Sequence, residues 1–130
     1  KYFQDQKQKY QYYFSLRNLS FFKFWLGIYP IKNLNIIYRN YTEKNDEQKI
    51  EELVKFCKRI NRKVFISNRI NLAFKYNFDG LYIPSFQKQL RFQNITKKNL
   101  EIIGSAHNAS ELKIKEKQGC SHIFLSPIFK

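Results

Sequence analysis

The chain has 130 residues, of which 43% are hydrophobic and 18% aromatic, so it can pack one domain and is not an intrinsically disordered protein. It contains no run of about 18 uncharged apolar residues and no visible signal peptide, so we expect a cytoplasmic protein without a membrane span. The formal net charge of +14 favours anionic partners, either phosphorylated small molecules or nucleic acid.

The distribution of the lysines and cysteines along the chain bears on two possibilities, nucleic-acid binding and a zinc site. The lysines are spread along the whole chain rather than gathered in one block, which argues against nucleic acid, although a basic RNA-binding module stays an alternative. Cys57 and Cys120 fall in different predicted elements, with no CxxC motif and no Cys/His cluster. We therefore predict two free thiols and no zinc site.

The first half of the chain contains two predicted strands and one clear helix. After a polar lead-in, residues 11–16 have strand character, residues 19–28 are apolar and fit either a helix or a buried loop, and residues 33–41 form a strand rich in Ile and Tyr. Residues 43–61 form an amphipathic helix with acidic side chains at its start and basic ones at its end. Its apolar side chains recur at spacings of three and four: Ile50, Leu53, Val54, Cys57 and Ile60.

The second half alternates short apolar segments with helical ones. Its best-marked helix is 107–119, where Asn108 and Glu111 form a capping box and Gly119 is a stop signal. The other predicted elements are, in order, a strand at 63–67, a helix of about two turns at 69–77, a strand at 79–84, a polar loop at 85–99, a strand at 100–106 and a strand at 121–127.

Strands therefore alternate with helices from residue 33 onward, a pattern that predicts a parallel sheet with crossover helices. A (β/α) barrel and an open doubly wound sheet both satisfy this order. No GxGxxG or GxxxxGK[ST] motif follows a strand, so neither nucleotide-binding motif supports the open sheet.

Two stretches resemble the thiamine phosphate synthase family, which includes thiazole tautomerases. IIGSAHNASELKIKEKQGCSHIFLSPIF (102–129) is similar to the family's I-G-x-S-x-H strand end, capped helix, G-A-D-Y-I strand and G-P-I-F or S-P-V loop. ISNRINLAFKYNFDGLYI (66–83) is similar to its I-N-D-R elbow, short helix and G-A-D-G-V-H-L strand. The resemblance covers about residues 34–130. It implies an α/β protein with the (β/α)₈ TIM barrel fold, and we treat residues 1–130 as one partial barrel domain.

The length of the chain limits what the resemblance can imply. An eight-stranded barrel needs about 200 residues or more, and this sequence stops after the sixth predicted strand. Six strands would leave two apolar edges open. We therefore expect a fragment or a truncated gene product that is insoluble or molten, and inactive, by itself.

The resemblance implies a transferase that joins hydroxymethylpyrimidine diphosphate to thiazole phosphate and releases diphosphate, a step of thiamine biosynthesis. Three residues are expected to be catalytic. Arg39 would neutralise the leaving diphosphate, because a guanidinium fork suits phosphate oxygens. Ser105 and His107 would line the pyrimidine pocket, although His107 also fits a plain flank of the capped helix.

The same resemblance implies a set of substrate-binding residues at the strand ends: Ser67, Asn68, Arg69, Tyr82 and Ser126. Arg69 fits a surface arginine at a helix start equally well. His122 falls inside a predicted strand, and we interpret it as structural.

The metal site departs from the family pattern. The family's two Mg²⁺ carboxylates correspond to Asn68 and Gln87, and of its Q-x-R-x-K motif only Arg39 remains. Amide oxygens carry no charge, whereas Mg²⁺ prefers anionic oxygen ligands. This favours an alternative: a thiazole tautomerase, or a relative that binds a thiamine precursor without catalysis. The sequence makes no prediction of oligomeric state.

Overall fold

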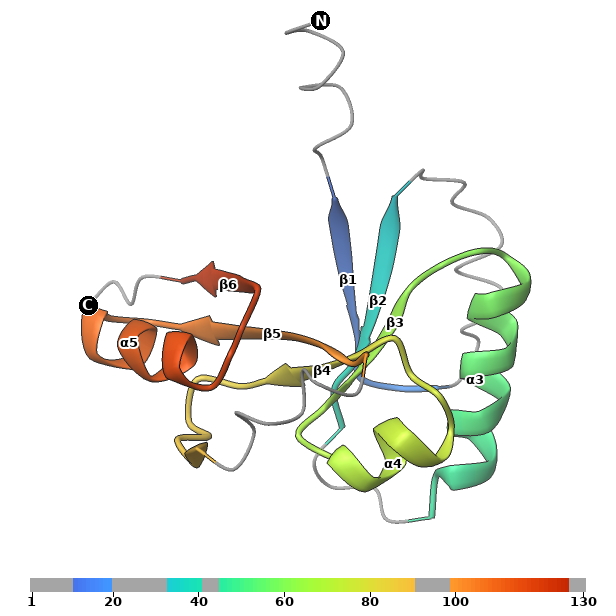
Figure 1. Ribbon diagram of the computed structural model, residues 1–130. Coiled ribbons are helices and arrows are strands. Elements are labelled where there is room, and N and C mark those ends of the chain that lie inside the picture. The colour runs from blue at the N-terminus through green and yellow to red at the C-terminus, as the bar shows by residue number, and fades with distance from the viewer. Residues whose placement is uncertain (1–10, 20–32, 41–44, 91–98, 127–130) are drawn as a thin grey trace, which may run out of the picture. The chain divides into compact units, whose positions relative to one another are not determined.

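The computed structural model describes residues 11–19, 33–40, 45–90 and 99–126, which belong to two compact units, residues 1–64 and 65–130 (Figure 1). The predicted polar lead-in, nearly all of the apolar segment 19–28 and most of the loop 85–99 lie outside the described residues. Each unit is described by itself.

The first unit contains two parallel strands and one helix. Strands β1 (Tyr12–Leu16) and β2 (Leu34–Tyr38) pair in parallel, and all five residues of β2 are buried. Helix α3 (Glu47–Arg59) confirms the predicted amphipathic pattern. Its buried face consists of Ile50, Leu53, Val54 and Cys57.

A buried polar pair connects β2 to the start of α3. The Tyr38 hydroxyl donates a hydrogen bond of 2.6 Å to Oδ2 of Asp46, the N-cap residue of α3, and neither residue is more than 1% exposed. A buried polar atom without a partner costs about 1–3 kcal/mol, so this bond makes the burial of both groups tolerable. The pair therefore belongs to the core of the first unit.

The second unit is a β/α alternation in which four strands pair in parallel. Strand β3 begins at the last residue of the first unit. The elements are β3 (Val64–Ser67), α4 (Ile70–Lys75), β4 (Gly80–Ile83), β5 (Glu101–Ala106), α5 (Ala109–Lys117) and β6 (His122–Leu125).

The order of these four strands in space is the order in sequence, β3-β4-β5-β6. An open doubly wound sheet reverses its strand order at a switch point. No such reversal occurs among these four strands, so the unit is consistent with part of a TIM-like barrel. The predicted parallel sheet with crossover helices is confirmed within this unit.

Left-handed residues follow the helices at their carboxyl ends. Asn61 comes after α3 and Asn77 after α4, with φ angles of 61° and 59°, and Gly119 comes after α5 with a φ of 90°. Asn reaches this region more readily than most residues because its short polar side chain bonds locally. The predicted stop at Gly119 is confirmed, and asparagine marks the ends of the other two helices.

The predicted cap of α5 is confirmed with one difference. Oδ1 of the N-cap Asn108 accepts a hydrogen bond of 2.9 Å from the Glu111 N–H. The Glu111 carboxylate, however, accepts from the N–H of His107 at 2.7 Å, one residue before the cap, instead of from Asn108 itself. The helix start is thus tied to the end of β5.

Within the described part of the chain, the helices are too short and too polar to cross a membrane.

Candidate functional site

The candidate site residues of the second unit lie at the carboxyl ends of its strands. The register pairs Ser67 of β3 with Tyr82 of β4, Tyr82 with Ile103 of β5, and Ser105 of β5 with Phe124 of β6. Because the strands are parallel, all their carboxyl ends lie at the same edge of the sheet. In barrels of this kind that edge carries the chemistry.

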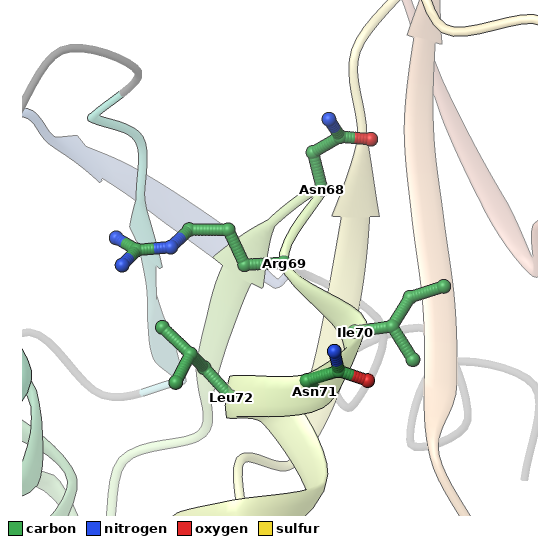
Figure 2. A pocket seen from close by; sticks show the side chains of 5 residues that line it. All are labelled: Asn68, Arg69, Ile70, Asn71 and Leu72. Atoms are coloured by element: carbon green, nitrogen blue, oxygen red, sulfur yellow. The ribbon is translucent and has the colours of Figure 1, made fainter. Parts of the chain in front are cut away.

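The elbow after β3 borders an open depression. Asn68 adopts a left-handed conformation with a φ of 64°, and its backbone N–H donates to the Tyr82 carbonyl at 2.9 Å. The five consecutive residues from Asn68 to Leu72 line a depression of about 430 Å³. Figure 2 shows the Asn68 amide and the Arg69 guanidinium extending in different directions from the elbow, ahead of the first turn of α4.

The next two strands contribute a pair of hydroxyl groups. The Tyr82 hydroxyl donates a hydrogen bond of 2.7 Å to Oγ of Ser105. Tyr82 is 4% exposed and Ser105 is half-buried, so the aromatic ring is covered while the serine reaches toward solvent. The two predicted residues are thereby brought together, with the serine hydroxyl still able to donate to a ligand.

The two amides expected at the metal site meet each other. Nε2 of Gln87 donates to Oδ1 of Asn68 at 2.9 Å, and Oε1 of Gln87 accepts from the Gln89 N–H at 3.1 Å. The Asn68 oxygen thus accepts from Gln87, the Gln87 oxygen accepts from the main chain, and both side chains are uncharged. No group of three or more His, Cys, Asp or Glu side chains suited to a metal occurs among the described residues.

Mg²⁺ holds its ligands by charge and octahedral geometry, usually with one or two carboxylates. The pair Asn68–Gln87 offers amide oxygens only, and the oxygens of both amides already accept hydrogen bonds. These residues do not fit a Mg²⁺ site of the carboxylate type that the resemblance implies.

The remaining candidates of the second unit surround the ends of β5 and β6. His107 is exposed, and its Nδ1 lies 3.4 Å from Oε1 of Glu111 on the first turn of α5. Ser126 is exposed, and its N–H donates to the Ala106 carbonyl at 3.1 Å. The contacts with Glu111 place His107 at the flank of the capped helix, which is one of its two interpretations. Because its ring is exposed, the other interpretation, a residue of the pyrimidine pocket, stays a prediction.

Three predicted residues lie differently from this group. Ser67 is only 2% exposed inside β3, so it stands behind the elbow instead of lining the depression. Arg39 belongs to the first unit, directly after β2, where its N–H donates to the Leu16 carbonyl at 2.9 Å. His122 was interpreted as structural, but its side chain is exposed at the start of β6, with Nδ1 3.1 Å from Oγ of Ser121.

Sequence reasoning missed two buried polar residues on and after α5. Lys115 and Gln118 are completely buried, and the half-buried Cys120 follows them. The signal that could have found them is the sequence of α5 itself, in which polar side chains stand at a spacing of three where a helix facing a sheet normally has apolar ones.

Burial changes the proton affinity of two of these groups. Desolvation lowers the pKa of Lys115, against the opposing attraction of Cys120 and Glu111. Burial raises the pKa of the Cys120 thiol to about 11, against the opposing charge of Lys115. Cys57 and Cys120 are both thiols outside a disulfide, as predicted.

Comparison with known proteins gives one consistent family. Residues 33–130 match the sequence model of the TMP-TENI family, described as thiamine monophosphate synthase. The thiamine-phosphate synthase of Prochlorococcus marinus subsp. pastoris is 27% identical over 100 residues, which are 74% of this chain and 28% of that protein. The protein of the same name from another Prochlorococcus marinus strain is 34% identical over 94 residues, 68% of this chain and 27% of that protein.

Among solved structures, the thiamine phosphate pyrophosphorylase of Pyrococcus furiosus superposes with a TM-score of 0.58 at 17% identity. The superposition covers 74% of this chain and 48% of that one. At this identity the likeness shows the shared fold. The chain spans less than a third of the length of these curated relatives.

Proposed function

The chain belongs to the thiamine monophosphate synthase family, and from that premise we propose that it forms part of a transferase of thiamine biosynthesis. The reaction joins hydroxymethylpyrimidine diphosphate to thiazole phosphate and releases diphosphate. The fold proposed for the full-length protein is a (β/α)₈ barrel. The observation that carries the proposal is the Tyr82–Ser105 hydrogen bond beside the elbow Asn68–Arg69, at the carboxyl ends of three successive strands.

Arg69 supports the diphosphate role because it lines the depression at the elbow. A guanidinium group can give two parallel hydrogen bonds to phosphate oxygens while it neutralises their charge. As the bond between the pyrimidine methylene and the diphosphate breaks, negative charge builds up on the departing oxygen, and a fixed cation stabilises that transition state.

Ser105 and Tyr82 support the pyrimidine role. The Tyr82 hydroxyl uses its proton on Ser105, which leaves the Ser105 proton for an acceptor on the substrate ring. This fixed direction would orient the pyrimidine for attack by the thiazole nitrogen. We place His107 and Ser126 at the rim, on either side of the β5–β6 strand ends, as contacts to the pyrimidine and the thiazole phosphate.

The test is an assay of the full-length protein with both substrates, following diphosphate release and thiamine phosphate formation. We expect product to form, and Arg69→Met to lower kcat/KM by about a hundredfold, as loss of a transition-state contact does. Arg59→Met on the exposed side of α3 makes the same charge change and is the matched control. Absence of both products with the intact protein would overturn the proposal.

The Asn68–Gln87 amide pair favours a second candidate within the same family: a tautomerase, or a protein that binds a thiamine precursor without catalysis. Neither of these functions releases diphosphate, so neither needs Mg²⁺ to neutralise the charge of that leaving group. Repeating the assay with Mg²⁺ and with EDTA separates the two. Diphosphate release that requires Mg²⁺ supports the transferase, whereas thiazole phosphate binding without diphosphate release supports the second candidate.

A further inference from the structure

Helix α5 faces β5 with polar side chains. Figure 1 shows the helix beside this strand, and Lys115 and Gln118, one turn apart, are both completely buried. The lysine stem passes over Gly104 of β5, where an added Cβ would lie 2.9 Å from Cδ of Lys115 and 3.0 Å from Sγ of Cys120. The absence of a side chain at Gly104 therefore leaves the space that the stem occupies.

Among the described residues, the buried lysine forms no ion pair, although Glu111 attracts it electrostatically. In the described part of the chain, no carboxylate lies within ion-pair distance of its ammonium group, which donates a hydrogen bond of 2.8 Å to the Gln87 carbonyl oxygen. A buried cation is costly unless it is paired and hydrogen-bonded, and a single neutral carbonyl offsets this cost only in part. This cost points to a role beyond packing.

Both buried side chains donate hydrogen bonds to the same short loop after β4. Nε2 of Gln118 donates to the carbonyl oxygens of Gln87 at 3.0 Å and of Gln89 at 2.9 Å, alongside the bond from Lys115. Three hydrogen bonds from one helix face thus hold the main chain of residues 87–89.

Loop 87–89 is in turn hydrogen-bonded to Asn68 at the elbow after β3. The Gln87 side chain is held at one end by the Gln89 N–H and donates at the other to Oδ1 of Asn68. Asn68 is in turn tied to β4 through the Tyr82 carbonyl, and it lines the depression. A continuous series of hydrogen bonds therefore runs from α5 through loop 87–89 to the mouth of the depression, all within the second unit.

We propose that Lys115 and Gln118 are positioning residues that fix loop 87–89 and, through Gln87, set the orientation of the Asn68 amide at a phosphate-binding depression. The ligand class, a diphosphate group, rests on the proposed function. Lys115 is completely buried and does not touch the ligand, so its effect passes through Gln87 and Asn68.

The experiment uses the full-length protein and two readouts. The first is the side-chain NH₂ signal of Gln87 in a ¹H–¹⁵N NMR spectrum, which reports the hydrogen bond to Asn68. The second is the affinity for inorganic pyrophosphate by titration calorimetry. In Lys115→Met, which keeps an unbranched apolar stem, we expect the Gln87 signal to move toward that of exposed glutamines and pyrophosphate affinity to fall about tenfold.

Lys113→Met is the matched control, because Lys113 is exposed on the same helix and the charge change is identical. We expect it to leave the Gln87 signal in place and to change affinity less than about twofold. If Lys115→Met fails to fold, Gln118→Met decides, since it removes two of the three bonds without changing charge, and we expect the same signal to move.

The outcomes separate this inference from the function on which it rests. A folded Lys115→Met or Gln118→Met protein with an unmoved Gln87 signal and unchanged pyrophosphate affinity overturns the positioning role. An intact protein that does not bind pyrophosphate contradicts the proposed ligand, yet the Gln87 signal of the variants still supports or overturns the positioning role.

Discussion

Each unit contains a strand-end tyrosine whose hydroxyl bonds a polar side chain, and the two pairs differ in what surrounds them. In the first unit, Tyr38 and Asp46 are both sealed from solvent. In the second, the hydroxyl of the covered Tyr82 meets the half-buried Ser105. The bonds have nearly the same length, 2.6 and 2.7 Å. Access of the partner to solvent, not the bond itself, separates a structural pair from one that can serve a ligand.

The largest effect on the free energy of unfolding should come from a substitution in the Tyr38–Asp46 pair. Asp46→Ala leaves the Tyr38 hydroxyl buried without this acceptor. We expect the free energy of unfolding of the full-length protein to fall by about 3 kcal/mol in urea titrations. Glu52→Ala on the exposed face of α3 should change it by less than about 0.5 kcal/mol. A loss below 1 kcal/mol for Asp46→Ala would mean that the sealed pair is not structural.

A second prediction extends the comparison to Cys120, a half-buried thiol of the second unit. Because burial raises the pKa of Cys120 from 9.0 to about 11, its thiolate fraction at pH 8 falls from about one in ten to about one in a thousand. Alkylation of Cys120, followed site by site with mass spectrometry, should be about a hundredfold slower in the folded than in the unfolded protein.

The sign of the pH dependence follows from the same shift. A raised pKa keeps the folded thiol protonated while the unfolded thiol loses its proton above pH 9, so stability decreases from pH 9 toward pH 11. If the alkylation rate of folded Cys120 instead rises with a midpoint at or below pH 9, burial does not raise its pKa and the prediction is wrong.

The smallest effect on stability should come from a substitution in the Tyr82–Ser105 pair. Tyr82→Phe leaves Ser105 able to bond water, so we expect unfolding to change by less than about 1 kcal/mol while kcat/KM falls about tenfold. Tyr76→Phe, at the half-exposed end of α4, is the control and should leave both quantities near wild type. If Tyr82→Phe instead destabilises as much as Asp46→Ala, then both pairs are structural and the comparison fails.

Local pattern was enough to predict most of the elements and several of their ends. The spacing of Ile50, Leu53, Val54 and Cys57 predicted α3, because a helix repeats every 3.6 residues and can bury only one side. Asn108 predicted the start of α5, because its side chain satisfies a free backbone N–H in the first turn. These signals involve residues a few positions apart, which the sequence shows directly.

Other features depend on residues far apart in the chain. The resemblance placed Asn68 and Gln87 at a metal site, but it could not show that the two amides, 19 positions apart, bond to each other. Lys115 looked like one of many surface lysines until the sheet covered it. Five left-handed asparagines also escaped notice, because asparagine only permits this conformation, whereas the surrounding structure imposes it.

By itself, the sequence determined the alternation of strands and helices, the parallel pairing, the family and the edge at which the site residues gather, because periodicity, caps and strand-end motifs are local. Only the tertiary structure decided which polar groups are sealed and which reach solvent: Asp46 against Ser105, Lys115 against Lys113. Burial is set by what other segments place over a side chain, and the access of its hydrogen-bond partner to solvent then separates a structural pair from one that can serve a ligand.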